Sequence, residues 1–172
     1  YISSTIIDGG ANGFPVVHFQ SGESNDAKLI GLTVQNGLTV LHAWGAGIDI
    51  RLSSTPTLDH LIIQNNNHQS GSGGGIAFYY AGDTSILKNL VIRNNTSTGH
   101  GVIYSFNSTF DLSNSKIYGN TGESESIYLW HGNAGVPISN CVIHDNTGSK
   151  VFHSGGNDVF LNCTIVNNSG SI

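Results

Sequence analysis

The sequence predicts an all-β solenoid, in which similar coils stack and their strands pair in parallel. Two observations predict it. First, a nine-residue segment recurs along the chain, and its sixth residue, here called the anchor, returns every 22 to 29 residues. Second, a shorter apolar segment that follows a glycine-rich stretch recurs with a similar period. A repeat of this length is the strongest signal in a sequence and is interpreted before any other.

The anchor segment has the pattern of a short strand between two turns. The anchors are Val34, Ile63, Ile92, Ile117, Ile143 and Ile165. Because strand side chains alternate, the anchor and the residue two before it share a face. Asn often stands three residues before the anchor, as Asn89 does, and it suits a tight corner because it tolerates left-handed backbone. Asn pairs such as Asn94 and Asn95 follow the anchor and predict a second turn.

The second ladder predicts another strand in every coil. Its segments begin at Val17, Ile48, Ile76, Ile103, Ile127 and Phe152. Two ladders with the same drifting period indicate turns of variable length around a constant core. With 172 residues, the chain is expected to form one domain, residues 1–172, of about six to seven coils. At about 4.8 Å a coil, the rod would be roughly 30 Å long.

From Ile6 to Asn168 these repeats resemble the right-handed parallel β-helix of the pectate-lyase-like superfamily. The resemblance implies the right-handed, single-stranded form of the helix. It also suggests a polysaccharide-degrading or polysaccharide-binding domain, although a fold by itself does not determine function. A leucine-rich repeat has a similar period, but it requires regular Leu spacing and a helical return segment, and neither is present.

Composition favours a protein that is secreted or exposed on a cell surface. Charged residues make up 10 % of the chain and the net charge is −5, which disfavours nucleic acid as a partner. No apolar run reaches the 18 residues of a membrane span. The ends of a solenoid expose unpaired strand edges and usually need caps. We expect this chain to be uncapped at both ends, as a fragment of a longer surface protein or as a unit that associates end to end in a filament.

The candidate binding site is an aromatic strip on the outward face of the second ladder. Alternation predicts that its rings are Tyr79, Tyr104, Phe106, Tyr128 and Trp130. Exposed apolar surfaces usually bind a partner, and flat rings suit stacking against the sugar rings of a polysaccharide. Asp49, Arg51 and His153 would be the polar partners, with Asp49 and Arg51 paired on the surface. The alternatives are that loops bury the rings or that the rings pack against another subunit.

The sequence predicts no catalytic residue, cofactor or metal. Glycoside hydrolysis needs two facing carboxyl groups, and only Asp49 is acidic in the outward column. One carboxylate does not supply the six to eight oxygens that calcium prefers. Gly99–Gly101 resembles the Gly-His-Gly motif of β-helical polygalacturonases, but their other motifs are absent. We therefore interpret it as a glycine turn that contains a His.

Cys141 and Cys163 occupy the same repeat position in consecutive coils. Their Cα atoms would lie about 4.8 Å apart, within the range of a disulfide. Parallel side chains would leave the Cβ atoms equally far apart, so we expect two free thiols packed in the core.

Two hypotheses about function follow. The chain is an extracellular structural or adhesive module without catalysis, part of a filament or of a longer surface protein. Alternatively, it is a polysaccharide-binding or polysaccharide-degrading domain.

Overall fold

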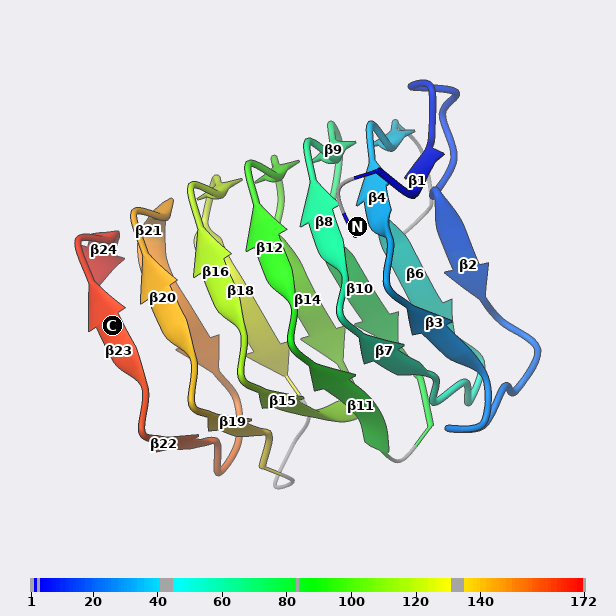
Figure 1. The fold of residues 1–172 in the computed structure, drawn as a ribbon. Helices are drawn as coiled ribbons and strands as arrows, with labels where there is room; N and C mark the ends of the chain where they lie inside the picture. The colour runs from blue at the N-terminus through cyan, green and yellow to red at the C-terminus, as the bar shows by residue number, and fades with distance from the viewer. Residues whose placement is uncertain (1, 3, 41–44, 83, 131–134, 172) are drawn as a thin grey trace.

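The protein is a right-handed parallel β-helix of about six coils, seen in a computed structural model (Figure 1). The structure describes residues 2, 4–40, 45–82, 84–130 and 135–171. Every ordered element in these ranges is a strand, and every strand pair is parallel. The predicted fold class is confirmed.

Sheet A contains the anchors. Its strands, in spatial order, are β1 (Ile6–Asp8), β4 (Thr33–Gln35), β8 (Ile62–Gln64), β12 (Val91–Arg93), β16 (Lys116–Tyr118), β20 (Val142–His144) and β23 (Thr164–Val166). Anchors of successive coils are partners in this sheet, as Val34 is of Ile63 and Ile63 of Ile92. The predicted register is therefore confirmed.

Sheet C precedes sheet A in each coil. Its strands are β3 (Lys28–Ile30), β7 (Thr57–Asp59), β11 (Thr84–Lys88), β15 (Thr109–Ser113), β19 (Pro137–Ser139) and β22 (Val159–Leu161). The sequence analysis did not separate it from the anchor strand. Left-handed residues three before the anchor make the bend between the two sheets, such as His60 (φ 51°) and Asn89 (φ 56°). This confirms the predicted Asn corner.

Sheet B has two limbs that join in β21 (Thr147–Ser154). The long limb continues through β18 (Glu125–Trp130), β14 (Ile103–Phe106), β10 (Ile76–Tyr79), β6 (Ile48–Arg51) and β2 (Val17–Phe19). The short limb has β17 (Thr121–Gly122), β13 (Thr96–Ser97), β9 (Asn67–His68) and β5 (Leu38–Thr39), and β24 (Ser169–Ser171) pairs with β21.

The segment that connects the two limbs shortens from coil to coil. It comprises residues 40–47, then 69–75, 98–102 and 123–124, and in β21 the chain passes from one limb to the other without interruption. The core beneath does not change with this length, because the strands on either side keep their register. The sequence prediction of variable turns around a constant core is confirmed.

Apolar side chains from all three sheets fill the interior. The anchors Ile63, Ile92 and Ile117 are fully buried, and Phe78 stacks on Phe110 with ring centroids 4.8 Å apart. Burial of one such side chain contributes about 1.5–3 kcal/mol. Because equivalent residues of neighbouring coils contact each other, the core is one continuous column.

The two cysteines belong to this column as free thiols. Cys141 is buried, and its burial raises the pKa of the thiol to about 11. Cys163 is half-buried. Cys163 is less enclosed than expected from its place in the repeat.

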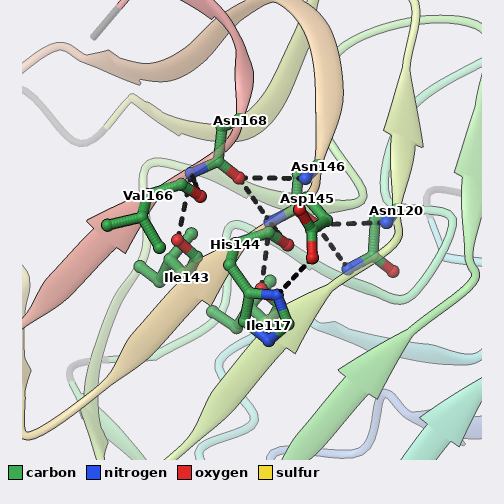
Figure 2. Close-up of polar contacts among 8 residues, drawn as sticks. All are labelled: Ile117, Asn120, Ile143, His144, Asp145, Asn146, Val166 and Asn168. Carbon is green, nitrogen blue, oxygen red and sulfur yellow. Dashed lines mark hydrogen bonds and ion pairs between the residues drawn. The ribbon is translucent and has the colours of Figure 1, made fainter.

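A ladder of asparagine side chains runs through the interior where sheet A turns into the short limb. It consists of Asn66, Asn95, Asn120, Asn146 and Asn168, and we call it the asparagine ladder. Each Nδ2 donates to the Oδ1 of the next member at 2.9–3.1 Å. The backbone N–H of each member donates to the same oxygen. Figure 2 shows the last three members side by side.

The ladder also ties each coil to the sheet A strand of the coil before it. Nδ2 of Asn120 donates to the carbonyl of Ile92, and Nδ2 of Asn146 donates to the carbonyl of Ile117, both at 2.9 Å. The amides are thus satisfied although Asn120 is fully buried. An unsatisfied buried amide would cost about 1–3 kcal/mol, so the ladder works only when it is continuous.

The residue before each ladder member has left-handed backbone, as in Asn65 (φ 55°) and Asn94 (φ 54°). The turn predicted from the Asn pairs is therefore confirmed. The sequence analysis assigned both residues of a pair to the turn. It missed that the second one points into the core.

We expect Asn120→Ala to lower the free energy of unfolding by about 3–5 kcal/mol. The change removes the acceptor of the backbone N–H of Asn95, one of the two acceptors of its Nδ2, one donor to Oδ1 of Asn146 and the side-chain donor to the carbonyl of Ile92, all in a buried site. Urea titration followed by circular dichroism measures the loss. Asn94→Gly is the matched control, because Asn94 is exposed and Gly adopts the same backbone. Equal effects of the two changes would contradict a structural role for the ladder.

Candidate functional site

The residues predicted to form the aromatic strip lie on one face of the long limb, here called the sheet B face. One column contains Asp49, Ala77, Tyr104, Tyr128 and His153, and the next contains Arg51, Tyr79, Phe106 and Trp130. The strand register therefore brings all eight predicted site residues together. Their role in binding stays a prediction.

The rings of this face stack on one another. Tyr104 and Tyr128 lie 5.3 Å apart between centroids, and Tyr128 and His153 lie 4.7 Å apart. The ring of His100, from segment 98–102, packs on that of Tyr128 with centroids 4.5 Å apart. The ring centroids of Trp130 and His153 are 5.9 Å apart. Parallel pairing repeats the ring positions about every 4.8 Å, which is close to a stacking distance.

Exposure of the face increases from β6 to β21. Asp49 and Ala77 are fully buried and Tyr104 is 5 % exposed, whereas Tyr128 and His153 are half-buried and Trp130 is 43 % exposed. The segments between the limbs become shorter in the same direction. Burial raises the pKa of Tyr104 far above its usual value. Of the alternatives left open for the rings, burial therefore holds for Tyr104, and Asp49, which was expected on the surface, is covered as well.

The buried Asp49 forms a charge cluster with the half-buried Arg51 and the exposed His18. Its Oδ2 accepts hydrogen bonds from Nε of Arg51 at 2.8 Å and from Nη2 of the same residue. The same oxygen lies 3.0 Å from Nε2 of His18. Oδ1 has no hydrogen-bond partner in the described part of the chain. Asp49 and Arg51 do pair as predicted, but the Asp49 carboxylate is fully buried, whereas the Arg51 side chain remains 23 % exposed.

This burial governs the titration of both groups. Desolvation raises the pKa of Asp49 above its usual value, and the positive charge of Arg51 opposes the shift only in part. Desolvation also lowers the pKa of His18, and the carboxylate of Asp49 opposes that shift. Both groups are thus biased towards their neutral forms.

A second buried carboxylate, that of Glu125, lies between two imidazole rings near the exposed end of the sheet B face. Oε2 of the buried Glu125 is 3.0 Å from Nδ1 of His100, and its Oε1 is 3.7 Å from Nδ1 of His153. Burial raises the pKa of Tyr128, and the charge of Glu125 adds to the shift. The sequence analysis missed this cluster because Glu125 has the same alternation as the inward Ile127. The Gly99–Gly101 turn that holds His100 is confirmed, with Gly101 at φ 43°.

The two buried carboxylates do not face a common substrate position. Asp49 and Glu125 lie on β6 and β18, three strand spacings apart, which corresponds to about 14 Å. The carboxyl pairs of glycosidases are separated by about 5–9.5 Å. Within the described ranges, no group of three or more His, Cys, Asp and Glu side chains is placed to hold a metal ion. Those ranges also contain no helix long and apolar enough to span a bilayer.

A groove of about 570 Å³ lies at the corner between sheet C and the long limb, and we call it the corner groove. Residues from three successive coils line it, among them Ser24, Asn25, Ser53, Thr55, Gly82 and Thr84. The sequence analysis missed it because these residues belong to turns and loops that share no motif.

Comparison with known families agrees with this geometry. A family model described as a right-handed β-helix region matches residues 16–172. Comparisons with curated proteins and with solved structures gave no match.

We expect the stability difference between the protein and its Asp49→Asn variant to decrease as pH rises. Because the folded-state pKa of Asp49 is raised, this group stabilises the fold fully below the pKa of the unfolded state, about 3.9, and the contribution is lost as pH rises through the folded-state pKa. Urea titrations from pH 3 to pH 7 measure the difference. Asp111→Asn removes an exposed carboxylate as a control. A difference that grew with pH would mean that Arg51 and His18 outweigh desolvation.

Proposed function

Since the chain belongs to the right-handed β-helix family, we propose that it is a structural and adhesive rod of an extracellular surface, which holds polysaccharide on its sheet B face without catalysis. The observation that carries the proposal is the graded exposure of the ring stack. Tyr104 is covered, Tyr128 and His153 are half-buried, and Trp130 stands at the open end with 43 % of its surface exposed.

The open end is pre-organised for stacking. Trp130 contacts the imidazole of His153, and that imidazole stacks on Tyr128 and faces Glu125. A ring that is already held by its neighbours loses little conformational freedom when a ligand packs on it. Aromatic rings present an apolar face, and the polar groups of His100 and His153 lie beside it to orient a sugar hydroxyl.

The absence of catalysis is supported by how the carboxylates are used. Asp49 is enclosed and paired with Arg51, and Glu125 is buried against His100. Their separation is too large for a glycosidase pair. Both carboxylates therefore act as structural partners of cationic or imidazole groups in this proposal.

A structural role is supported by the interior. The asparagine ladder and the in-register sheets connect every coil to the next along the rod axis. Such a rod would hold a binding face at a fixed distance from the surface that carries it. Whether rods associate end to end into filaments is tested by electron microscopy of the purified protein.

We expect Trp130→Ala to weaken polysaccharide binding at least tenfold without loss of folding, because the change removes the exposed ring and no core contact. Affinity electrophoresis through gels that contain single polysaccharides measures binding, and circular dichroism checks the fold. Phe14→Ala is the matched control, because Phe14 is an exposed aromatic residue outside the sheet B face. Reducing-sugar and unsaturated-product assays should show no turnover. Release of products by the wild-type protein, or unchanged binding by the variant, would refute the proposal.

A further inference from the structure

The corner groove is a second concave surface on the rod, separate from the open end of the sheet B face. It extends over three successive coils, from the loop before β3 to the turn before β11. Two strand spacings correspond to about 10 Å along the rod axis. Its volume of about 570 Å³ lies within the range of small-molecule binding sites. We propose that the corner groove binds a short stretch of neutral polysaccharide.

The groove is held in shape by hydrogen bonds between the coils that line it. The backbone N–H of Thr55 donates to the carbonyl of Glu23 at 2.6 Å, and the hydroxyl of Thr57 donates to the carbonyl of Asn25 at 2.9 Å. Nδ2 of Asn25 donates to the carbonyl of Thr84 at 3.3 Å. One loop is therefore tied to both of the next two coils, so the groove exists before a ligand arrives and binding requires little ordering.

The carboxylate of Glu23 is part of this bracing. Its Oε2 accepts the hydroxyl of Ser54 at 2.6 Å and the backbone N–H of Ser21 at 2.9 Å. The described residues that line the groove are Gly, Ser, Thr and Asn, and none of them carries a charge. This lining offers no counter-charge to an acidic sugar, which favours a neutral ligand.

The chemistry of the lining matches a sugar hydroxyl. The side chains of Ser24, Ser53 and Thr55 both donate and accept hydrogen bonds, and the amide of Asn25 does the same through two different atoms. Sugar hydroxyls have the same dual character, so either partner can supply the proton. No acidic or basic group is required.

Two exposed apolar residues lie in the turns that contribute these polar groups. Leu52 directly precedes Ser53 and is 61 % exposed, and Tyr80 precedes the groove residue Gly82 by two positions and is 52 % exposed. The backbone N–H of Ser53 donates to the carbonyl of Tyr80, which places the two turns side by side. The ring of Tyr80 is held edge-on by Tyr79 and Phe106. A sugar has apolar C–H faces and a polar edge, and this corner offers a surface for each.

The test uses the whole 172-residue chain. Affinity electrophoresis measures its binding to four neutral polysaccharides, namely dextran, xylan, galactomannan and a mixed-linkage glucan. Polygalacturonate is the acidic polysaccharide for comparison. Ser24→Trp fills the groove from an exposed position, and Tyr80→Asn removes the exposed ring while keeping a residue that tolerates its left-handed backbone (φ 47°). Ser149→Trp places the same bulk at an exposed position on the short-limb side of β21. Circular dichroism checks that each variant is folded.

We expect at least one neutral polysaccharide to retard the protein more than polygalacturonate does. Ser24→Trp should reduce that affinity at least tenfold, Tyr80→Asn should reduce it to a lesser degree, and Ser149→Trp should not change it. The proposal is overturned if none of the neutral polymers binds, or if Ser24→Trp binds as tightly as the wild type.

This inference assigns polysaccharide to the rod, as the proposed function does, but the two can fail separately. Repeating Ser24→Trp in a Trp130→Ala background isolates the corner groove. If binding depends on Trp130 alone, the corner groove proposal is wrong and the proposed function stands. If it depends on Ser24 and is unchanged by Trp130→Ala, the sheet B face is not the adhesive surface.

Discussion

The register of parallel pairing between coils is the constraint on which the rest of this structure depends. Inward and outward side chains alternate along each strand, so a slip of one residue would expose a whole row of Ile and Leu. The asparagine ladder enforces the same register by a different interaction. The amide of Asn120 has its partners only when Asn95 and Asn146 stand directly beside it. Apolar burial thus determines which side chains of a strand point inward, and the hydrogen bonds of the asparagine amides fix the register between neighbouring coils.

The same register builds the sheet B face. Tyr104, Tyr128 and His153 stack because parallel pairing places equivalent residues about one ring spacing apart. It also places Asp49 beside His18, where the carboxylate is enclosed and Arg51 compensates for part of its charge. Stacked rings and the charge cluster are therefore consequences of one geometric rule, applied to different residues at one repeat position.

The sequence was sufficient to predict the features that repeat. The anchors, the left-handed Asn89 and its equivalents, and the two columns of the sheet B face all follow from spacing and alternation. Features that depend on contacts between different repeat positions were not predictable in this way. Asn94 and Asn95 are the same residue type, yet Asn94 lies exposed in a turn and Asn95 is buried in the asparagine ladder. Alternation also could not show that segment 98–102 places His100 over Tyr128, or that turns of three coils enclose the corner groove.

The segment between the limbs of sheet B varies in length from residues 40–47 to no residues at all, while the strands around it keep their register. Insertions and deletions at this corner are therefore tolerated by the rod, because they change neither the pitch nor the core. Descendants of one ancestral rod could thus diverge in the ligands that they recognise through changes of loop length alone, and a designed peptide inserted at 123–124 would be displayed next to Glu125, at the start of β18, on an unchanged scaffold.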